Sequence, residues 1–385
     1  MDKVFKYELF NKMIRDFAVN EVKPLAHEVD EQERFPYETV EKMAKLGLMG
    51  IIVPKEYGGM GGDYKMYIKA VEELSKVCAT TGVILSAHTS LCIAPIMEYG
   101  NEEQKKKYLP KLASGEWLGA FGLTEPNAGT DANNQTTTAV KEGDHWVLNG
   151  SKIFITNAGP ANVYFVIAVT GRNPKGVECA AFIVEKGFPG FSVGKKELKM
   201  GIRGSSTCEL IFENCIVPEA NLVGKIGEGV KMALKTLDGG RVGISAQALG
   251  IAQGALEATV AYVKERKQFN KPISAFQNTQ FCLADLYTKI NAASLLVERA
   301  TEAKQNKSPM LGMYAAQAKL FAAETAMEVT TKCVQLHGGL RLYERVSRRE
   351  NDARRQNHRD LRRHKRSSAH GYFRRAAQKI GDRQK

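Results

Sequence analysis

The stretch HWVLNGSKIFIT, from His145 to Thr156, separates two kinds of sequence and decides the fold class. Its Asn149-Gly150 pair stands between two strand-like runs, and Asn-Gly in this setting is a strong signal for a two-residue hairpin turn. Three more β-rich runs follow, VYFVIAVT, AAFIVE and CELIFENCIV, separated by Gly, Pro and Asn. We therefore predict a small antiparallel β-domain over residues 116–225.

Helical patterns lie on both sides of this region. Before it, YETVEKMAKLGLMGI and DYKMYIKAVEELSKV repeat apolar residues at helical spacing, and EEQKKKYLPKLASGEW predicts a short helix that Pro110 interrupts. After it, residues 227–269 predict one long helix with a possible break at Gly239-Gly240, and the small residues between Ala246 and Ala255 allow neighbouring helices to approach closely. SAFQ, from Ser274 to Gln277, fits a capping box that opens the next helix.

These patterns predict an α+β protein in three parts followed by a tail. The parts are an N-terminal helical domain over residues 1–115, the β-domain, and a C-terminal helical domain over residues 226–339. Residues 340–385, which we call the basic tail, are expected to be aberrant and disordered.

Composition excludes several classes of protein. With 43% hydrophobic and 25% charged residues, the chain is ordinary for a soluble globular protein, no apolar run reaches the length of a membrane span, and the N-terminus is no signal peptide. The seven cysteines are scattered without a CxxC pair, which is typical of reduced thiols in the cytoplasm. The seven histidines show no spacing typical of a metal site.

The net charge of +13 comes almost entirely from the basic tail. The tail holds 13 Arg and 3 Lys against five acidic residues, whereas the rest of the chain holds 39 basic and 37 acidic residues. The arginine run lacks aromatic residues for stacking and is attached to a nearly neutral body, and both features argue against a nucleic-acid-binding function. We therefore expect no nucleic-acid partner and no membrane partner. A Walker A loop and a Rossmann GxGxxG are also missing, and YGGMGG at residues 57–62 predicts a loop.

Six motifs follow one another along the chain. They are GAFGLTEPNAGTDA (119–132), KIFITNAG (152–159), KMGIRGSSTCELIFENCIVPEANLVG (199–224), LDGGR (237–241), ERKQFNKPISAFQ (265–277) and QLHGG (335–339). With these motifs in this order, residues 1–339 resemble the acyl-CoA dehydrogenase family, and within it the short-chain, butyryl-CoA-type bacterial enzymes. The resemblance implies the α+β fold described above with a four-helix bundle as its C-terminal domain, FAD as cofactor, and α,β-desaturation of a short-chain acyl-CoA. It also implies electron-transferring flavoprotein as the electron acceptor and a homotetramer.

The resemblance assigns FAD contacts to two sets of residues. From the β-domain, Thr124 and Thr156 would hydrogen-bond the flavin ring, which Phe121, Leu123, Phe154 and Ile155 would line. The helical part would contact the FAD of a neighbouring subunit and the FAD diphosphate and adenosine. Its residues in this set are Arg266, Phe269, Gln277, Gln335, Gly338 and Gly339.

The resemblance assigns substrate contacts to three further residues. Thr130 would lie near the thioester, and Asp238 and Arg241 would face the pantetheine of CoA.

Each of these residues also has an ordinary structural interpretation. The two threonines are common at strand ends, and Leu123, Phe154 and Ile155 have the pattern of strand core. Arg266 is typical of a helix end, the Gly338-Gly339 pair of a helix stop, and Asp238 with Arg241 of a local ion pair.

The catalytic base implied by the resemblance is missing. The family continues after the two glycines with a Tyr-Gly-Tyr segment, a helix and Ile-Tyr-Glu-Gly-Thr, whose Glu removes the α-proton of the substrate. Here Arg341 replaces a glycine, and the expected Glu falls in the region of Arg362 and Arg363. Some family members carry the base at the position of Gly240, and glycine cannot serve as a base.

A change of reading frame explains the basic tail most simply. The codons GAT-CTA-CGA-AGG-CAC would encode Asp360 to His364 and, read from the second base, give Ile-Tyr-Glu-Gly. The same shift over Ser347 to Asp360 can restore the helix of the family. We therefore expect the tail to be a frameshift product.

Two other functions stay open beside the dehydrogenase. One is a flavin- or CoA-binding relative without turnover, and the other is a nucleic-acid-binding protein that uses the basic tail. An acyl-CoA oxidase of the same superfamily differs mainly in letting oxygen reach the reduced flavin, which sequence spacing does not reveal.

Overall fold

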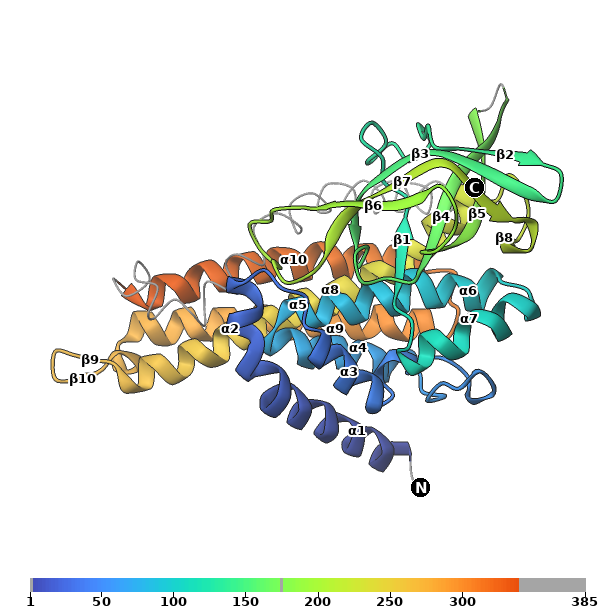
Figure 1. The fold of residues 1–385 in the computed structure, drawn as a ribbon. Helices are drawn as coiled ribbons and strands as arrows, with labels where there is room; N and C mark the ends of the chain where they lie inside the picture. The colour runs from blue at the N-terminus through green and yellow to red at the C-terminus, as the bar shows by residue number, and fades with distance from the viewer. Residues whose placement is uncertain (1–2, 174–175, 339–385) are drawn as a thin grey trace, which may run out of the picture.

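The structure is a computed structural model that describes residues 3–173 and 176–338. Its helices and its sheet confirm the predicted α+β fold class, with helices before and after one β-rich segment (Figure 1). The helices are α1 Lys3–Phe17, α2 Lys23–Glu31, α3 Tyr37–Lys45, α4 Tyr64–Val77, α5 Ala79–Ala87, α6 Ala94–Tyr99, α7 Glu102–Ser114, α8 Gly229–Glu265, α9 Gln277–Gln305 and α10 Leu311–Leu336. Two π-helical segments, η1 Ala18–Val22 and η4 His88–Ile93, interrupt the α-helical stretches.

The strands form a sheet that lies against the helical layer (Figure 1). They are β1 Gly119–Gly122, β2 Thr138–Glu142, β3 His145–Thr156, β4 Val163–Asn173, β5 Gly176–Glu185, β6 Phe191–Lys196, β7 Thr207–Pro218 and β8 Leu222–Val223. Their order is β6-β7-β3-β2-β4-β5-β8, with β1 beside β4. Both β1 and β2 pair with β4 in parallel, so the prediction of an antiparallel sheet was wrong for these two pairs. Along the chain, more than a hairpin turn separates β1 and β2 from β4, as parallel pairing requires.

The Asn149-Gly150 pair does not form the predicted turn, because both residues lie inside the continuous strand β3. Gly150 has φ +136°, and a Cβ there would lie 2.7 Å from the Cα of Thr137. The β3–β7 register shifts at this point, and the Asn149 side chain exchanges hydrogen bonds with Asn214. The hairpin turn lies instead at Gly143 (φ +61°), where Glu142 pairs with His145. Gly150 therefore permits a close backbone contact and a bulge within the strand.

Two predicted helix breaks are also absent. Helix α7 runs through Pro110 because a complete capping box at Asn101 and the buried side chains of Tyr108, Leu109 and Leu112 stabilise it. Helix α8 runs from Gly229 to Glu265 without a break at Gly239-Gly240. In both helices tertiary packing outweighs the weak local preference for a break.

The predicted capping box at Ser274 is wrong. Helix α9 begins at Gln277 after Phe276, which caps it without a side-chain hydrogen bond. Ser274 belongs to a short 3₁₀ turn, Ile273–Ala275, and its carbonyl accepts a hydrogen bond from Gln280 Nε2. Gln277 therefore has no capping role.

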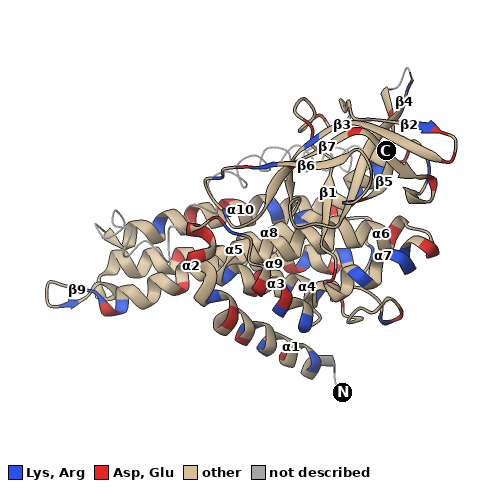
Figure 2. Ribbon diagram, viewed as in Figure 1, with Lys and Arg blue, Asp and Glu red and all other residues tan. Residues whose placement is uncertain are grey.

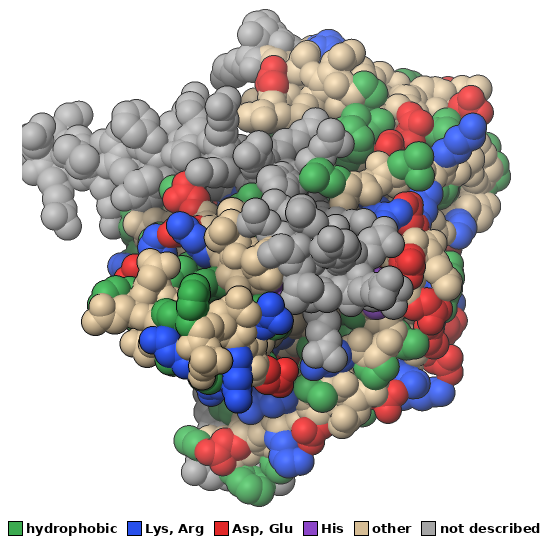
Figure 3. Space-filling view, turned by 90° about the vertical axis from the view of Figure 1, so that its left-hand side faces the viewer, with side chains coloured by type: hydrophobic (Ala, Val, Ile, Leu, Met, Phe, Trp, Pro, Cys, Tyr) green, Lys and Arg blue, Asp and Glu red, His purple; other side chains and the backbone are tan. Residues whose placement is uncertain are grey.

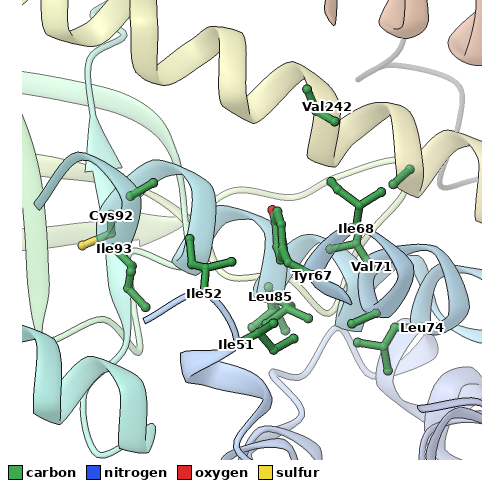
Figure 4. Packing of buried hydrophobic residues seen from close by; sticks show 14 of the residues in the cluster. Ile51, Ile52, Tyr67, Ile68, Val71, Leu74, Leu85, Cys92, Ile93 and Val242 are labelled. Atoms are coloured by element: carbon green, nitrogen blue, oxygen red, sulfur yellow. The ribbon is translucent and has the colours of Figure 1, made fainter. Parts of the chain in front are cut away.

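Helices α4 and α8 pack closely because α8 presents glycines to α4, which confirms the role predicted for the small residues. A Cβ at Gly250 would lie 2.3 Å from the carbonyl oxygen of Glu72, and one at Gly254 would lie 2.1 Å from that of Lys76. Farther along the same interface, Val242 of α8 faces Ile68 and Val71 of α4 (Figure 4).

We expect Gly254→Ala to lower the free energy of unfolding by about 2–3 kcal/mol, because the methyl group would displace the backbone of α4. Gly239→Ala, on the same helix, is the matched control. Its Cβ would meet nothing nearer than Lys304 Cε at 3.4 Å, so a gain of up to about 1 kcal/mol from helix propensity is expected. Urea unfolding of both variants measures the difference. Equal stability of the two would contradict this account of the packing.

One segment corrects the expectation about apolar runs. Ala79–Tyr99, which comprises α5, η4 and α6, is long and apolar enough to cross a membrane by length and composition. However, 78% of its apolar window is buried inside the protein, as in a core helix. Its apolar character is therefore explained by packing between the sheet and the other helices.

Charged residues of both signs alternate along the described helices and strands (Figure 2). They are interspersed in the same way on the described surface of the face in Figure 3. All seven cysteines are free thiols. The basic tail, including its predicted disorder, lies outside the described residues.

Candidate functional site

The ends of β1 and β3 bring Thr124 and Thr156 into one region. The backbone N–H of Ile153 donates to the carbonyl oxygen of Thr124 at 2.8 Å. This hydrogen bond joins the chain after β1 to the C-terminal part of β3. Both threonines are half-buried, and neither side chain makes a hydrogen bond within the described part of the chain. Two hydroxyl groups are thus available to a ligand at this edge.

A β-bulge, which no sequence pattern predicted, shapes the same edge. The β3–β7 register shifts between Lys152 and Ile155, and Phe154 has φ +60°. A left-handed conformation is uncommon for a phenylalanine, and bulges occur often beside active sites. Phe154 is 43% exposed, so its assignment to the strand core was wrong. Phe121, Leu123 and Ile155 are buried, as a core assignment expects.

A buried ion pair lies directly behind this edge. Lys152, in β3, is fully buried, and its Nζ donates to Glu125 Oε1 at 2.7 Å, to Gln135 Oε1 at 2.8 Å and to the carbonyl oxygen of Leu123 at 3.3 Å. Glu125 also accepts hydrogen bonds from the N–H groups of Thr136 (2.6 Å) and Thr137 (3.1 Å). Every group of this cluster is therefore paired.

The surroundings keep both members of the pair ionised at neutral pH. Burial alone would raise the pKa of Glu125, but the Lys152 ammonium and the hydrogen bonds from Thr136 and Thr137 outweigh it and lower the pKa to about 2. Burial lowers the pKa of Lys152 to about 8, against the opposing attraction of Glu125. Lys152 and Glu125 lie within the motifs, but their residue types alone do not predict this role, because a lone Lys or Glu is usually exposed.

The π-helical segment η4 lies between β1 and α8. A Cβ at Gly119 of β1 would lie 2.5 Å from Cys92 Sγ, and a Cβ at Gly240 of α8 would lie 2.9 Å from Leu91 Cδ2. Asp238 and Arg241 form the predicted ion pair on the same stretch of α8. The substrate candidates of α8 thus lie on the helix that packs against η4, while Thr130 is exposed in the loop after β1.

His88 joins η4 to β1 and α7 as a neutral side chain. Its Nδ1 accepts from the N–H of Gly119 at 3.0 Å, so Nε2 carries the proton and donates to the carbonyl oxygen of Leu112 at 3.1 Å. Burial lowers the pKa of His88 from 6.5 to about 4.

We expect His88 to make stability pH-dependent. As the pH falls below 6.5, the unfolded chain binds the proton first, so stability declines until the pH reaches about 4. The loss between pH 7 and pH 5 should be about 2 kcal/mol. Urea unfolding at the two pH values measures it, with His88→Gln as a side chain that does not titrate. An equal pH dependence in the variant would refute the assignment.

The remaining FAD candidates gather far from the sheet. Arg266 follows α8, Phe269 is 88% exposed in the β9–β10 hairpin (Lys267–Gln268 and Lys271–Pro272), and Gln277 opens α9. Tyr262 of α8 stacks on His337 at a ring-centroid distance of 4.1 Å, which places the end of α10, with Gln335 and Gly338, beside this group. Figure 1 shows the hairpin at the end of the helical layer opposite the sheet. Gly339, Arg362 and Arg363 lie outside the described residues.

The residues present fit FAD in three respects. Within the described part of the chain, the hydroxyl groups of Thr124 and Thr156 at the bulged edge have no hydrogen-bond partner, and neither does the buried Asn157 Oδ1 beside them. Gly338 has φ +62° with open space where a Cβ would be, so the backbone conformation requires glycine there. Among the described residues, no group of His, Cys, Asp and Glu could hold a metal ion.

A shallow surface groove of about 660 Å³ lies elsewhere, between α3 and α7. Tyr37, Val40 and Ala44 form part of its wall, and none of the predicted site residues lines it. The groove is therefore separate from the candidate site.

Comparisons with known proteins show the family of the chain. Models of the N-terminal, middle and C-terminal domains of acyl-CoA dehydrogenase match residues 6–116, 120–215 and 227–364. The chain is 59% identical over 332 residues to a short-chain specific acyl-CoA dehydrogenase of Clostridium acetobutylicum, with 86% of this chain and 87% of the relative covered.

Solved structures give the same result. Butyryl-CoA dehydrogenase of Megasphaera elsdenii matches with a TM-score of 0.90 and 44% identity, with 96% of this chain and 97% of that chain covered. A chain in the structure of the electron transferring flavoprotein of Acidaminococcus fermentans matches with a TM-score of 0.89 and 47% identity, with the same coverage. Three domain models in order and this identity over most of both chains show that the chain belongs to the acyl-CoA dehydrogenase family.

Proposed function

We propose that the chain derives from an FAD-dependent enzyme for the α,β-desaturation of short-chain acyl-CoA, with electron-transferring flavoprotein as the acceptor. The observation that carries this proposal is the bulged edge of β3, where the half-buried hydroxyl groups of Thr124 and Thr156, both within the family motifs, have no hydrogen-bond partner among the described residues. The 59% identity to a short-chain specific relative supports the choice of substrate.

The residues of the chain would bind and orient the two ligands. FAD supplies a two-electron acceptor when it is bound. Thr124 and Thr156 would hydrogen-bond the flavin ring, against the buried Leu123 and Ile155. Thr130 would lie near the thioester, and the ion-paired Asp238 and Arg241 would face the pantetheine.

The FAD candidates of the helical part, which we call the Arg266 group, would contact the FAD that is held by a second copy of the chain. Arg266, Phe269, Gln277, Gln335 and Gly338 lie at the end of the helical layer opposite the sheet (Figure 1). One copy alone therefore does not bring both FAD-binding groups together, and a site shared between subunits explains why Phe269 is 88% exposed. We propose a homotetramer in the cytoplasm as the working assembly.

A second candidate is a relative that binds flavin or CoA without turnover. It is favoured by the sequence itself, because neither family position for the base holds a carboxylate: Gly240 occupies one and the Arg362-Arg363 region the other. Without a base, the α-proton of the thioester stays in place however well the ligands are bound.

Reconstitution and substrate comparison test the proposal. With the family reading frame restored after Gly339, the protein should take up FAD and turn over butyryl-CoA at least about tenfold faster than octanoyl-CoA or palmitoyl-CoA, because a short pocket excludes additional methylene groups. Stopped-flow bleaching of the flavin under nitrogen measures the rates. Faster turnover of the longer substrates would refute the short-chain assignment, and a folded protein that takes up no FAD would refute the flavoprotein assignment.

A further inference from the structure

Both ends of the loop that carries Thr130 accept hydrogen bonds from the same buried ammonium group. Glu125 starts the loop and Gln135 ends it, and both accept a hydrogen bond from Lys152 Nζ, at 2.7 and 2.8 Å. Gln135 in turn donates through Nε2 to the carbonyl oxygen of Ala132 at 2.8 Å. A single fully buried side chain therefore closes the segment between residues 125 and 135.

The same ammonium also sets the edge that carries the threonines. Lys152 precedes the bulge in β3, and it donates to the carbonyl oxygen of Leu123, the residue before Thr124. Ile153, next to Lys152, donates its N–H to the carbonyl oxygen of Thr124 at 2.8 Å. The positions of Thr124 and of the chain that leads to Thr156 are thus coupled through one residue.

Stability alone does not account for an ion pair in this place. Replacing a buried ion pair by apolar side chains of similar volume is often neutral or stabilising. An apolar pair would, however, leave Gln135 Oε1 and the N–H groups of Thr136 and Thr137 without their partners. The ionic pair thus selects one conformation of the loop.

We propose that Lys152 is a positioning residue for both ligands: through Glu125 and Leu123 it places Thr124 beside the flavin edge, and through Gln135 it closes the loop that presents Thr130. This inference rests on the proposed function, because that function assigns the two threonines their ligands. Lys152 itself is buried behind the edge and touches neither ligand.

The test compares two double variants in the 385-residue chain. Lys152→Met with Glu125→Gln removes the buried pair without leaving an isolated charge. Lys141→Met with Glu219→Gln removes an ion pair that links β2 to the chain after β7, with both side chains about half exposed, and serves as the matched control. Hydrogen exchange of residues 126–134 and titration with FAD, followed by the visible absorption bands of the flavin, are measured for both.

The buried-pair variant should stay folded and exchange residues 126–134 at least about tenfold faster than the parent chain. If the chain binds FAD, the variant should bind it about tenfold more weakly, the effect of one misplaced hydrogen bond, with shifted flavin bands. The control should change neither property. Unchanged exchange overturns the proposal whether or not FAD binds, and unchanged FAD affinity and spectrum overturn it where FAD does bind. A parent chain that takes up no FAD, even with its frame restored, contradicts the proposed function instead, and the exchange comparison still decides the role of Lys152.

Discussion

The 385-residue chain should desaturate butyryl-CoA about 10²–10⁴-fold more slowly than a chain in which the reading frame is restored after Gly339. This range is the usual contribution of a positioned general base, and neither Gly240 nor the Arg362-Arg363 region supplies a carboxylate. We propose that restoring the frame returns the Ile-Tyr-Glu-Gly segment and with it the base. Steady-state turnover with an artificial electron acceptor measures the difference, after intact mass has identified each chain.

A control separates the base from the rest of the tail. A frame-restored chain whose glutamate codon is changed to encode glutamine should bind FAD and butyryl-CoA but turn over as slowly as the present chain. If that control were fully active, the base would lie elsewhere. Robust turnover by a protein whose mass matches the present 385 residues would overturn the prediction altogether.

Lys152→Met alone should destabilise the fold by about 3–5 kcal/mol, because it leaves the Glu125 carboxylate buried without its cation. The carboxylate would keep its hydrogen bonds from Thr136 and Thr137, which offset only part of this loss. Urea unfolding at pH 7 measures the change. Adding Glu125→Gln to Lys152→Met should recover most of the lost stability, since no uncompensated charge then remains.

The exposed Lys141–Glu219 pair is the reference against which the loss of stability in Lys152→Met is compared. Lys141→Met should cost less than about 1 kcal/mol, since exposed ion pairs contribute little to stability. A similar cost for Lys141→Met and Lys152→Met would show that Lys152 is not an essential partner of Glu125. A double variant no more stable than Lys152→Met would show that loss of packing, rather than the buried charge, causes the destabilisation.

Residue order alone was enough to predict the fold class, the order of helices and strands, and the family. Apolar periodicity depends on neighbours a few residues apart, so it predicted the β-rich runs of β4, β5 and β7 and the closely packed small residues of α8. The six motifs are likewise a property of residue order alone.

Local sequence signals gave wrong predictions where contacts between residues far apart in the sequence stabilised a different conformation more strongly. Asn149-Gly150 became part of a strand because Thr137 lies against Gly150, and Pro110 stayed inside α7 because the side chains around it are buried. The capping box at Ser274 gave way to a 3₁₀ turn before α9. In the first two cases the deciding neighbour or packing surface is fixed only when the whole chain has folded.

The tertiary structure was needed to show how the candidate site is built. It placed Thr124 beside the chain leading to Thr156, turned Phe154 outward at a bulge, and put the Arg266 group at the opposite end of the helical layer. It also buried Lys152 between Glu125 and Gln135, a role that residue type argues against, because an isolated buried ammonium is costly. The partners that offset this cost are 27 and 17 residues away along the chain, and folding alone brings them together.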